Sequence, residues 1–582
     1  MAETCKEKIL SEDYFDWVID FSLSEVLSED MLQKGDFCYQ EIEGEFGIVT
    51  INKNQLPDGG ISTVDYYYFP QLYGLEQEET EFGNRNEFNP QPLSVSGIIR
   101  AQEGNLNLTG NGVILAFADT GINYENPLFR NADGSSRILA IWDQMIQDGT
   151  PPEGFLYGTE YKREQINEAL RSENPKQIVP TTDEIGHGSQ MASVAAGSLL
   201  NEGSTFRSPA YGADIVMVKL KPCKDYLRKY FEIAEGVVAY QSTDLLMAIK
   251  YLDGFASAFN RPVVFCFGLG SNFGDHAGGG ILSRYLTLIG EKRSRAVVIS
   301  GGNQGNSALH YEGRITEKNG RDDVEIRVPE NVTGFMVELW GTLPASFSVS
   351  VQAPGGEVIT PLPVLFQNNV KYRFVYENTV ISVYNALTEQ GLGDELYVIR
   401  FSNPSPGIWT LRVTENSGVD NSVFHVYLPI REFLKDDIYF LQPSPDITLT
   451  TPAYSANSIT VSTYNSETNG FYIQSGRGFS RSNMIKPDIS APGVNISAGY
   501  RTLIGTPIIS EVTGSSMAAA LCAGAAAQLM QWTVTDGNSP YVRSREIKNL
   551  LIRGAIRDNN VEYPSELWGF GKLNIYNALS LG

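Results

Sequence analysis

The runs Pro262–Phe267 and Ala296–Ser300 constrain the fold most, because they are apolar along almost their whole length. A strand with one face in water alternates polar and apolar residues, whereas a strand covered by helices on both faces of a parallel sheet is apolar throughout. Gly112–Ala118 and Ala213–Leu220 have the same character, and small-residue segments that suit helices lie between such runs. Residues 93–309 therefore predict an α/β fold with a largely parallel sheet.

Residues 310–446 differ, because helical patterns nearly vanish there. Val324–Val328 and Phe347–Val351 alternate in the manner of half-buried strands, and Pro354–Gly356 forms a turn cluster after them. Short alternating segments separated by turn clusters are typical of an antiparallel sandwich or jelly roll. The α/β pattern resumes over residues 447–582, so we predict an all-β module inserted into an α/β catalytic domain.

The first 92 residues precede that domain. Residues 1–75 are acidic and end in the aromatic run Val64–Leu75, which we expect to be extended because aromatic residues favour strands and Pro70 stops a helix. Residues 76–92 are polar and poor in aliphatic side chains, so they predict an exposed linker of the kind at which chains are cut.

Charge and composition exclude several classes of function. The 44 Lys and Arg residues against 68 Asp and Glu residues give a net charge of −24, which repels nucleic acid. No segment approaches the roughly 20 apolar residues of a membrane helix, and the mixed-charge start lacks a secretory signal. We therefore expect that the chain does not enter the secretory pathway by the usual signal, with non-classical release as an alternative.

The five cysteines do not form a recognisable framework. They are odd in number, widely scattered and without C-x-x-C spacing, so we expect reduced or isolated thiols rather than disulfides or a zinc site. The acidic residues likewise lack the spacing of a calcium-binding loop, and we predict no metal and no cofactor. The cysteines are Cys5, Cys38, Cys223, Cys266 and Cys522.

Two candidate catalytic side chains stand at the predicted edge of the sheet. Asp119 follows the first buried strand, where open α/β sheets place their ligands, although Asp before Gly is also common in turns. His187 lies between two glycines at a predicted helix start, which would let another chain approach closely. Each residue taken alone also fits a structural role.

Two further candidates carry hydroxyl and amide groups. Ser516 opens an Ala-rich helix, where a serine either caps the helix or places its hydroxyl beside the positive end of the helix dipole. Asn303 follows a buried strand in a glycine-rich turn, and it is either a turn residue or an amide donor to an oxyanion. The order Asp, His, Ser along the chain is the order of the subtilisin triad.

At this point the sequence resembles the subtilisin-like serine peptidases (subtilases). The resemblance covers about residues 93–310 and 447–582. The motifs that carry it are Asp119-Thr120-Gly121, Gly186-His187-Gly188-Ser189, Asn303, Lys486 to Gly493 and Gly514-Ser515-Ser516-Met517-Ala518.

The resemblance implies a role for each residue. Ser516 would be the nucleophile, His187 its general base and Asp119 the carboxylate that orients the imidazole. Asn303 and the Ser516 backbone N–H would form the oxyanion hole. Departures from the family pattern are Ser515 and Ser189, where Thr is usual, and Ala520 and Leu521, where many members have proline and histidine.

The same resemblance implies how substrate and prodomain bind. Gly268, Leu269 and Gly270 would form the strand that pairs with an extended peptide substrate through main-chain hydrogen bonds. Residues 1–75 would be a prodomain whose tail lies in the cleft, with autocleavage near Gly74 or Leu75. An N-terminal subdomain that is never cut is the alternative.

The overall arrangement is similar to the clostridial germination proteases, the Csp group, whose prodomain can remain bound after cleavage. This likeness implies a bacterial protein that is cytoplasmic or spore-associated. The leading prediction is a serine endopeptidase that acts on a protein or peptide. The alternatives are a catalytically silent scaffold or receptor in spore germination signalling and, for residues 310–446, a carbohydrate-binding module or a stabilising insert.

Overall fold

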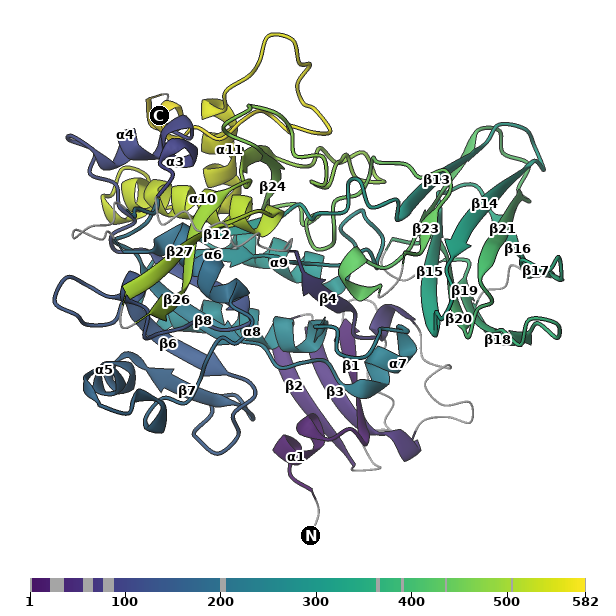
Figure 1. Cartoon of the computed structure of the whole chain (residues 1–582), viewed down its shortest axis with the longest axis horizontal. Coiled ribbons are helices and arrows are strands. Elements are labelled where there is room, and N and C mark those ends of the chain that lie inside the picture. Colours follow the sequence, from purple (N-terminus) through teal and green to yellow (C-terminus); the bar gives the residue numbers. More distant parts are fainter. Residues whose placement is uncertain are drawn as a thin grey trace.

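The computed structural model describes residues 3–20, 36–44, 46–55, 66–76, 88–198, 206–362, 367–388, 392–434, 437–503 and 506–580. Figure 1 shows three parts: a small N-terminal sheet at the bottom, a large sheet flanked by helices at the left, and a β module at the right. Strand β4 reaches from the N-terminal part into the region between the other two.

An eight-stranded sheet forms the centre of the large part, in the order β25-β24-β12-β10-β5-β8-β6-β7. Neighbouring strands are parallel, except that β7 runs antiparallel to β6 at one edge. The predicted α/β fold with a largely parallel sheet is therefore confirmed. The strands are β5 (Ile114–Asp119), β6 (Ile138–Asp143), β7 (Thr159–Lys162), β8 (Asp214–Lys219), β10 (Val263–Phe267), β12 (Arg295–Ser300), β24 (Ile459–Tyr464) and β25 (Ile489–Pro492).

Helices cover both faces of this sheet, so each strand contributes to two cores. Leu115 and Phe117 of β5 pack into the core that contains α6 and α10, whereas the alternate residues Ile114 and Ala116 pack into the core that contains α8 and α9. This double burial explains why the strand sequences are apolar throughout. The helices are α6 (His187–Ala196), α8 (Ser242–Ala258), α9 (Ile281–Glu291) and α10 (Ser515–Met530).

Shorter elements complete the large part. Helix α10 continues into one π-helical turn, Gln531–Thr535, and β26 (Ile496–Leu503) pairs with β27 (Thr506–Val512) as a hairpin. The others are α3 (Gln91–Val95), α4 (Ile98–Gln102), η4 (Pro127–Phe129), α5 (Arg163–Arg171), η5 (Pro175–Gln177), α7 (Asp225–Tyr230), β9 (Tyr240–Gln241), β11 (Leu269–Gly270), α11 (Ser544–Gly554) and α12 (Ile575–Ser580).

The inserted module consists of two antiparallel sheets around their own apolar core. One sheet has the order β13-β22-β15-β20-β19-β18 and the other β17-β16-β21-β14-β23. The strands are β13 (His310–Ile315), β14 (Arg321–Val328), β15 (Gly334–Gly341), β16 (Phe347–Gln352), β17 (Val358–Leu362), β18 (Gln367–Arg373), β19 (Val380–Ala386), β20 (Glu395–Ser402), β21 (Gly407–Glu415), β22 (Ser422–Tyr427) and β23 (Tyr439–Phe440), with η6 (Arg431–Phe433) between the last two.

The N-terminal part is a three-stranded antiparallel sheet, ordered β1-β3-β2, with helix α1 beside it. Its core residues Phe46 and Ile48 belong to the same cluster as helix α8, so this sheet packs on the catalytic domain. The elements are α1 (Cys5–Leu10), β1 (Tyr14–Asp20), β2 (Phe37–Glu43), β3 (Phe46–Asn52) and η1 (Lys53–Gln55).

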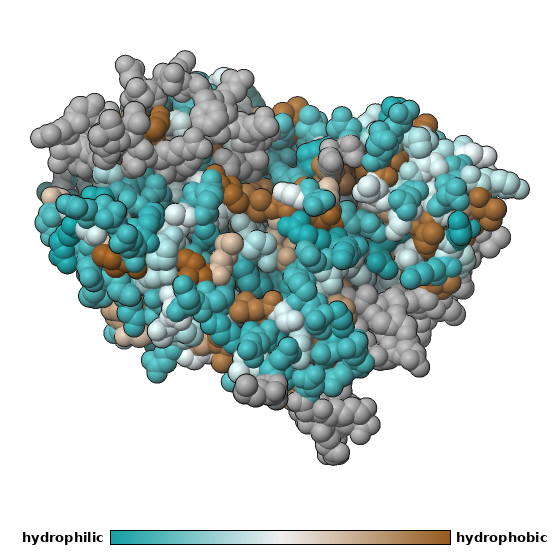
Figure 2. All heavy atoms as spheres, turned by 60° about the horizontal axis from the view of Figure 1, so that its bottom comes forward, coloured by the Kyte–Doolittle hydropathy of each residue, from teal (hydrophilic) through white to brown (hydrophobic). Residues whose placement is uncertain are grey.

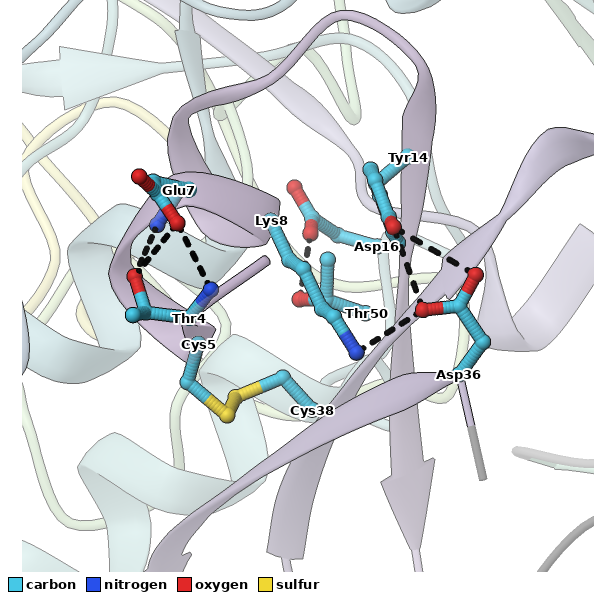
Figure 3. The surroundings of a disulfide bond; sticks show 9 residues. All are labelled: Thr4, Cys5, Glu7, Lys8, Tyr14, Asp16, Asp36, Cys38 and Thr50. Carbon is cyan, nitrogen blue, oxygen red and sulfur yellow. Dashed lines mark hydrogen bonds and ion pairs between the residues drawn. A yellow bond between two sulfur atoms is a disulfide. The ribbon is translucent and has the colours of Figure 1, made fainter. Parts of the chain in front are cut away.

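A disulfide between Cys5 and Cys38 joins α1 to β2 (Figure 3). The expectation that all five cysteines are unpaired was therefore wrong for these two, because the fold brings together residues 33 positions apart. Beside the disulfide, Lys8 forms an ion pair with Asp36 at 2.8 Å. Cys223, Cys266 and Cys522 are free and buried.

The aromatic run that ends the N-terminal part is only partly extended. Tyr66–Tyr68 forms a turn of 3-10 helix (η3), and the strand β4 covers only Leu72–Leu75. Residues 64 and 65 lie outside the described part of the chain. The aromatic side chains of Tyr66 and Phe69 pack in a cluster shared by all three parts of the molecule, and this tertiary packing overrides the strand propensity of the sequence.

The face of the molecule in Figure 2 is mostly hydrophilic, with small and scattered hydrophobic patches. One segment, Ser515–Thr535, is long and apolar enough to cross a membrane by length and composition, contrary to the sequence-based expectation. In the most apolar 18-residue stretch of this segment, 89% is buried inside the protein. The segment is therefore a core helix of the fold.

Candidate active site

The ends of β5 and the start of α6 bring Asp119 and His187 together. Nδ1 of His187 lies 2.8 Å from Oδ1 and 3.0 Å from Oδ2 of Asp119. Both side chains are almost completely buried. Helix α6 begins at His187 itself, so the predicted helix start is confirmed. The Asp119 carboxylate therefore holds the imidazole ring of His187 through Nδ1.

A second carboxylate, Asp183, fixes the start of helix α6. It accepts hydrogen bonds from the backbone N–H groups of Gly186 and Ser189 and from the hydroxyl groups of Thr120 and Ser189. These bonds satisfy N–H groups that have no partner inside the helix. Sequence reasoning did not single out Asp183, because its role depends on the loop conformation before His187.

Gly188 permits the close approach of α6 to the end of β5. A Cβ atom at this position would lie 2.2 Å from the carbonyl oxygen of Gly121 and 3.2 Å from Cβ of Asp119. Only glycine lets the two segments pack at this distance. The Gly-His-Gly sequence thus places the imidazole directly over the Asp119 carboxylate.

Ser516 lies in the first turn of helix α10 and is fully buried. Its hydroxyl donates a hydrogen bond to the carbonyl oxygen of Glu76, 3.1 Å away. Nε2 of His187 has no hydrogen-bond partner among the described residues. The predicted hydrogen bond between Ser516 and His187 is therefore not formed in this structure, because the hydroxyl is engaged by the chain that lies in the cleft.

Asn303 lies beside the same carbonyl group. Its Oδ1 accepts a hydrogen bond from the backbone N–H of Ser515 at 3.0 Å, which fixes the amide, while Nδ2 is buried and has no partner among the described residues. A Cβ atom on Gly514 would lie 3.0 Å from the Glu76 carbonyl oxygen and 3.6 Å from Asn303 Nδ2. An unpaired buried donor therefore lies in the same small space as the carbonyl that contacts Ser516.

The tail of the N-terminal part lies in the cleft as a strand. In β4, Leu75 and Gly74 pair antiparallel with Leu269 and Gly270 of β11. The backbone N–H of Glu76 donates to the carbonyl oxygen of Gly268 at 3.3 Å, which extends the pairing. All three residues predicted to bind a peptide, Gly268, Leu269 and Gly270, therefore contact an extended chain.

The other edge of β4 pairs with a strand as well, since Leu72 and Tyr73 lie opposite Gln241 and Tyr240 of β9. The tail is thus the middle strand of a three-stranded sheet. This register fixes which carbonyl meets Ser516. It is the carbonyl of Glu76, one residue beyond Leu75 and two beyond Gly74.

Glu76 itself was predicted to begin an exposed linker, but it is completely buried. Gln91, near the other end of the predicted linker, begins helix α3, and residues 77–87 lie outside the described part of the chain. No sequence signal marks Glu76 as buried, because a glutamate in a polar stretch ordinarily faces water.

The environment shifts the pKa values of the two ionisable groups nearest Ser516. Burial lowers the pKa of His187, but the charge of Asp119 and its hydrogen bond outweigh burial, so the net shift is upward from 6.5. Burial raises the pKa of Glu76 to about 7, against the opposing effect of hydrogen bonds from Ser300 and Thr450. The pKa values of both groups are therefore shifted upward.

The Lys486-Pro487-Asp488 motif is a structural element beneath the site. Lys486 is buried and forms an ion pair with Asp488 at 2.7 Å. Burial lowers the pKa of Lys486 to about 7, while Asp488 opposes the shift. Over the residues that the structure describes, there is no group of three or more His, Cys, Asp or Glu side chains suited to hold a metal ion.

The fold, the Asp119–His187 pair and the position of Ser516 at the start of helix α10 define a class of protein with known relatives. The sequence model of the subtilase family matches residues 110–358 and 442–571. The chain therefore belongs to this family of serine peptidases. No curated protein matches the chain in a sequence search.

Solved structures support the same assignment. The chain is similar to the CspB protease of Clostridium perfringens, with 29% identity and a TM-score of 0.74, over 85% of this chain and 99% of that one. A weaker likeness is to the epidermin leader peptide processing protease EpiP of Staphylococcus aureus, with 12% identity and a TM-score of 0.45, over 98% of each chain.

Proposed function

We propose that this protein is a serine endopeptidase that uses Ser516, His187 and Asp119, and that it cleaves its own chain after Glu76. One observation carries the proposal: the Ser516 hydroxyl lies 3.1 Å from the carbonyl oxygen of Glu76, in a chain paired as a strand with β11. A peptide carbonyl held beside a nucleophile at a helix N-terminus is the arrangement that precedes acyl transfer.

The reaction would follow the acyl-enzyme route. The Ser516 oxygen attacks the Glu76 carbonyl carbon and its proton passes to Nε2 of His187, whose other nitrogen is bonded to Asp119. Asn303 Nδ2 donates to the oxygen as negative charge develops on it. His187 then gives the proton to the leaving amine, the bond after Glu76 breaks, and a water molecule hydrolyses the ester.

Residues 1–76 would then be a prodomain that stays bound after cleavage. Pairing of β4 on both edges, with β11 and β9, supports retention. The inserted module contributes, because Glu338 of β15 accepts hydrogen bonds from the Tyr66 hydroxyl and from the Trp340 indole, the latter at 2.9 Å. Release of this tail would open the same cleft to a protein substrate.

N-terminal sequencing and intact mass of the purified protein test the proposal. Wild type should yield a new N-terminus at Gln77, and Ser516→Ala should remain a single chain of 64.1 kDa. Ser539→Ala is the matched control, because it removes a serine hydroxyl at an exposed position after helix α10 and should still be cut. Once the tail is released, a fluorophosphonate probe should label wild type and Ser539→Ala only.

The opposite outcome favours the silent scaffold. A wild-type chain that stays intact on prolonged incubation and takes up no probe would mean that the cleft holds its own tail without turnover. Cleavage of Ser516→Ala at the same rate as wild type would instead point to another protease in the preparation.

A further inference from the structure

The side chain of Glu76 occupies a pocket lined by hydroxyl groups. Its Oε1 accepts a hydrogen bond from Thr450, and its Oε2 accepts one from Ser300. The Ser515 hydroxyl lies 3.5 Å from Oε2. Both oxygens at the end of the side chain are therefore recognised, and all three contacts come from hydroxyl groups, which can donate or accept.

Two glycines give the pocket its size. A Cβ atom on Gly270 would lie 1.8 Å from Oε1 of Glu76, and one on Gly302 would lie 3.1 Å from the same oxygen. The first distance is far below van der Waals contact, so a side chain at position 270 would fill the space that the carboxyl group takes. The pocket is therefore matched to a side chain of glutamate length.

The pocket does not neutralise a negative charge. Among the described residues, no lysine or arginine forms an ion pair with Glu76. The charged groups that face it are His187 of α6, which lowers its pKa, and Glu432 of η6. The pKa of Glu432 is raised to about 7, mainly by burial and in part by the charge of Glu76. A second acid nearby makes a charged occupant still less favourable.

We infer that the Ser300, Thr450 and Ser515 hydroxyls form the specificity pocket of the peptidase and select an uncharged carbonyl-bearing side chain, glutamine or protonated glutamate, before the cleaved bond. This inference rests on the proposed function. A glutamine fits the same hydroxyls, since its amide N–H groups donate where a hydroxyl oxygen accepts. Leucine leaves the buried hydroxyls without partners, and lysine brings an unpaired charge.

The test follows self-cleavage of the full-length chain during cell-free translation, with variants at position 76. At pH 8, Glu76→Gln should be cut at least as fast as wild type, while Glu76→Leu and Glu76→Lys should be slower by about 100-fold or more. Glu76→Asp should also be slow, because its shorter side chain does not reach Thr450 and Ser300.

The pH dependence of the same reaction tests the demand for an uncharged side chain. The ratio of the Glu76→Gln rate to the wild-type rate should be near one at pH 6. Above pH 7 it should rise by about tenfold for each pH unit, as the neutral form of Glu76 becomes scarcer. The charge of Glu76 also raises the pKa of His187, so the His187 midpoint is fitted separately for each chain before the two rates are compared.

A pocket variant separates recognition from folding. Thr450→Val removes the hydroxyl and keeps the shape, and it should slow wild-type cleavage by about tenfold or more. Thr450→Ser keeps a hydroxyl and should restore the rate. If Glu76→Leu and Glu76→Lys are cut as fast as wild type, the specificity pocket is overturned and the peptidase proposal stands. If wild type is not cut at all, both proposals are overturned.

Discussion

The hydroxyl of Ser516 donates its hydrogen bond to the carbonyl oxygen of Glu76, while Nε2 of His187 has no partner among the described residues. The side chains proposed as nucleophile and base are thus not hydrogen-bonded to each other. In the proposed reaction, the Ser516 hydroxyl turns away from the carbonyl oxygen so that its proton can pass to His187. The same proposal requires the tail to depart before another substrate can reach Ser516.

Stability of the uncut chain should fall as pH rises, because Glu76 is buried in a pocket without a cation. Its pKa is raised from 4.5 to about 7, so the folded state binds the proton more tightly than the unfolded state does. An acid whose pKa is raised in the folded state does not destabilise the protein below pH 4.5. Between pH 4.5 and 7 it lowers the free energy of unfolding increasingly. In Ser516→Ala, the free energy of unfolding should lose up to about 3 kcal/mol over that window.

The control for this effect is the double variant Ser516→Ala/Glu76→Gln, which has no acid at position 76. Urea unfolding of the two proteins at several pH values gives the difference directly. The double variant should be the more stable protein above pH 7, and the two should converge near pH 5. Parallel pH profiles would mean that Glu76 is ionised in the folded protein and that the hydroxyl groups suffice to hold the charge.

Replacing Asp119 by Asn should slow self-cleavage by about 10⁴-fold, since the imidazole loses the carboxylate that orients it and stabilises its charge. In Glu76→Gln, which has no acid at position 76, the rate should reach half its maximum above pH 6.5, because the pKa of His187 is raised and only the neutral ring can take the proton. Adding Asp119→Asn to this variant should move the midpoint down, since burial lowers the pKa and the opposing charge of Asp119 is gone. An unchanged midpoint would show that another group controls the rate.

Removing the amide of Asn303 should slow the reaction by a factor of about 10²–10³, the usual cost of losing one oxyanion donor. Asn303→Ala also deletes the acceptor of the Ser515 N–H, so Asn303→Asp, which keeps an oxygen acceptor, is the informative companion. Both variants should be slow if Nδ2 stabilises the transition state. Recovery of the rate in Asn303→Asp would assign Asn303 to positioning of helix α10 only.

The sequence was sufficient to predict the parallel sheet and to single out Asp119 and His187, which lie in contact in the structure. Continuous apolar runs predicted β10 and β12 because a doubly covered strand has no polar face. Asp119 and His187 were recognisable because they follow a strand and precede a helix in short glycine-containing motifs. Their contact at 2.8 Å was nevertheless an inference from resemblance, since no local pattern reports a distance between residues 68 positions apart.

What the sequence could not predict depends on register and on pairing across the chain. The residue that meets Ser516 is set by how β4 aligns with β11, and a shift of one residue would present Leu75 instead of Glu76. The disulfide was missed for a similar reason, because cysteine spacing gives no information on which segments become neighbours in the N-terminal sheet.

The disulfide between Cys5 and Cys38 should stabilise the N-terminal part by about 2–4 kcal/mol, since it closes a loop in the unfolded chain. In the Ser516→Ala background, the change Cys5→Ser/Cys38→Ser should lower the urea concentration at which the N-terminal part unfolds. The sensitivity of this part to limited proteolysis measures that midpoint. Reductant should lower the urea midpoint of Ser516→Ala by the same amount. It should not change the midpoint of the variant that also lacks Cys5 and Cys38. Equal midpoints with and without reductant would show that packing on α8 suffices.

A last pair of substitutions tests whether the close contact of α6 and β5 sets the geometry of the site. Gly188→Ala should abolish most self-cleavage, because its Cβ would lie 2.2 Å from the Gly121 carbonyl oxygen and would push His187 away from Asp119. Gly254→Ala in helix α8 is the matched control: nothing lies within 4 Å of its Cβ. That change should stabilise the protein by about 0.5–1 kcal/mol and leave cleavage unaltered, because glycine is a poor helix former. Normal cleavage by Gly188→Ala, measured on a chain with wild-type circular dichroism, would show that the loop around Gly121 yields and that the contact does not hold the catalytic pair.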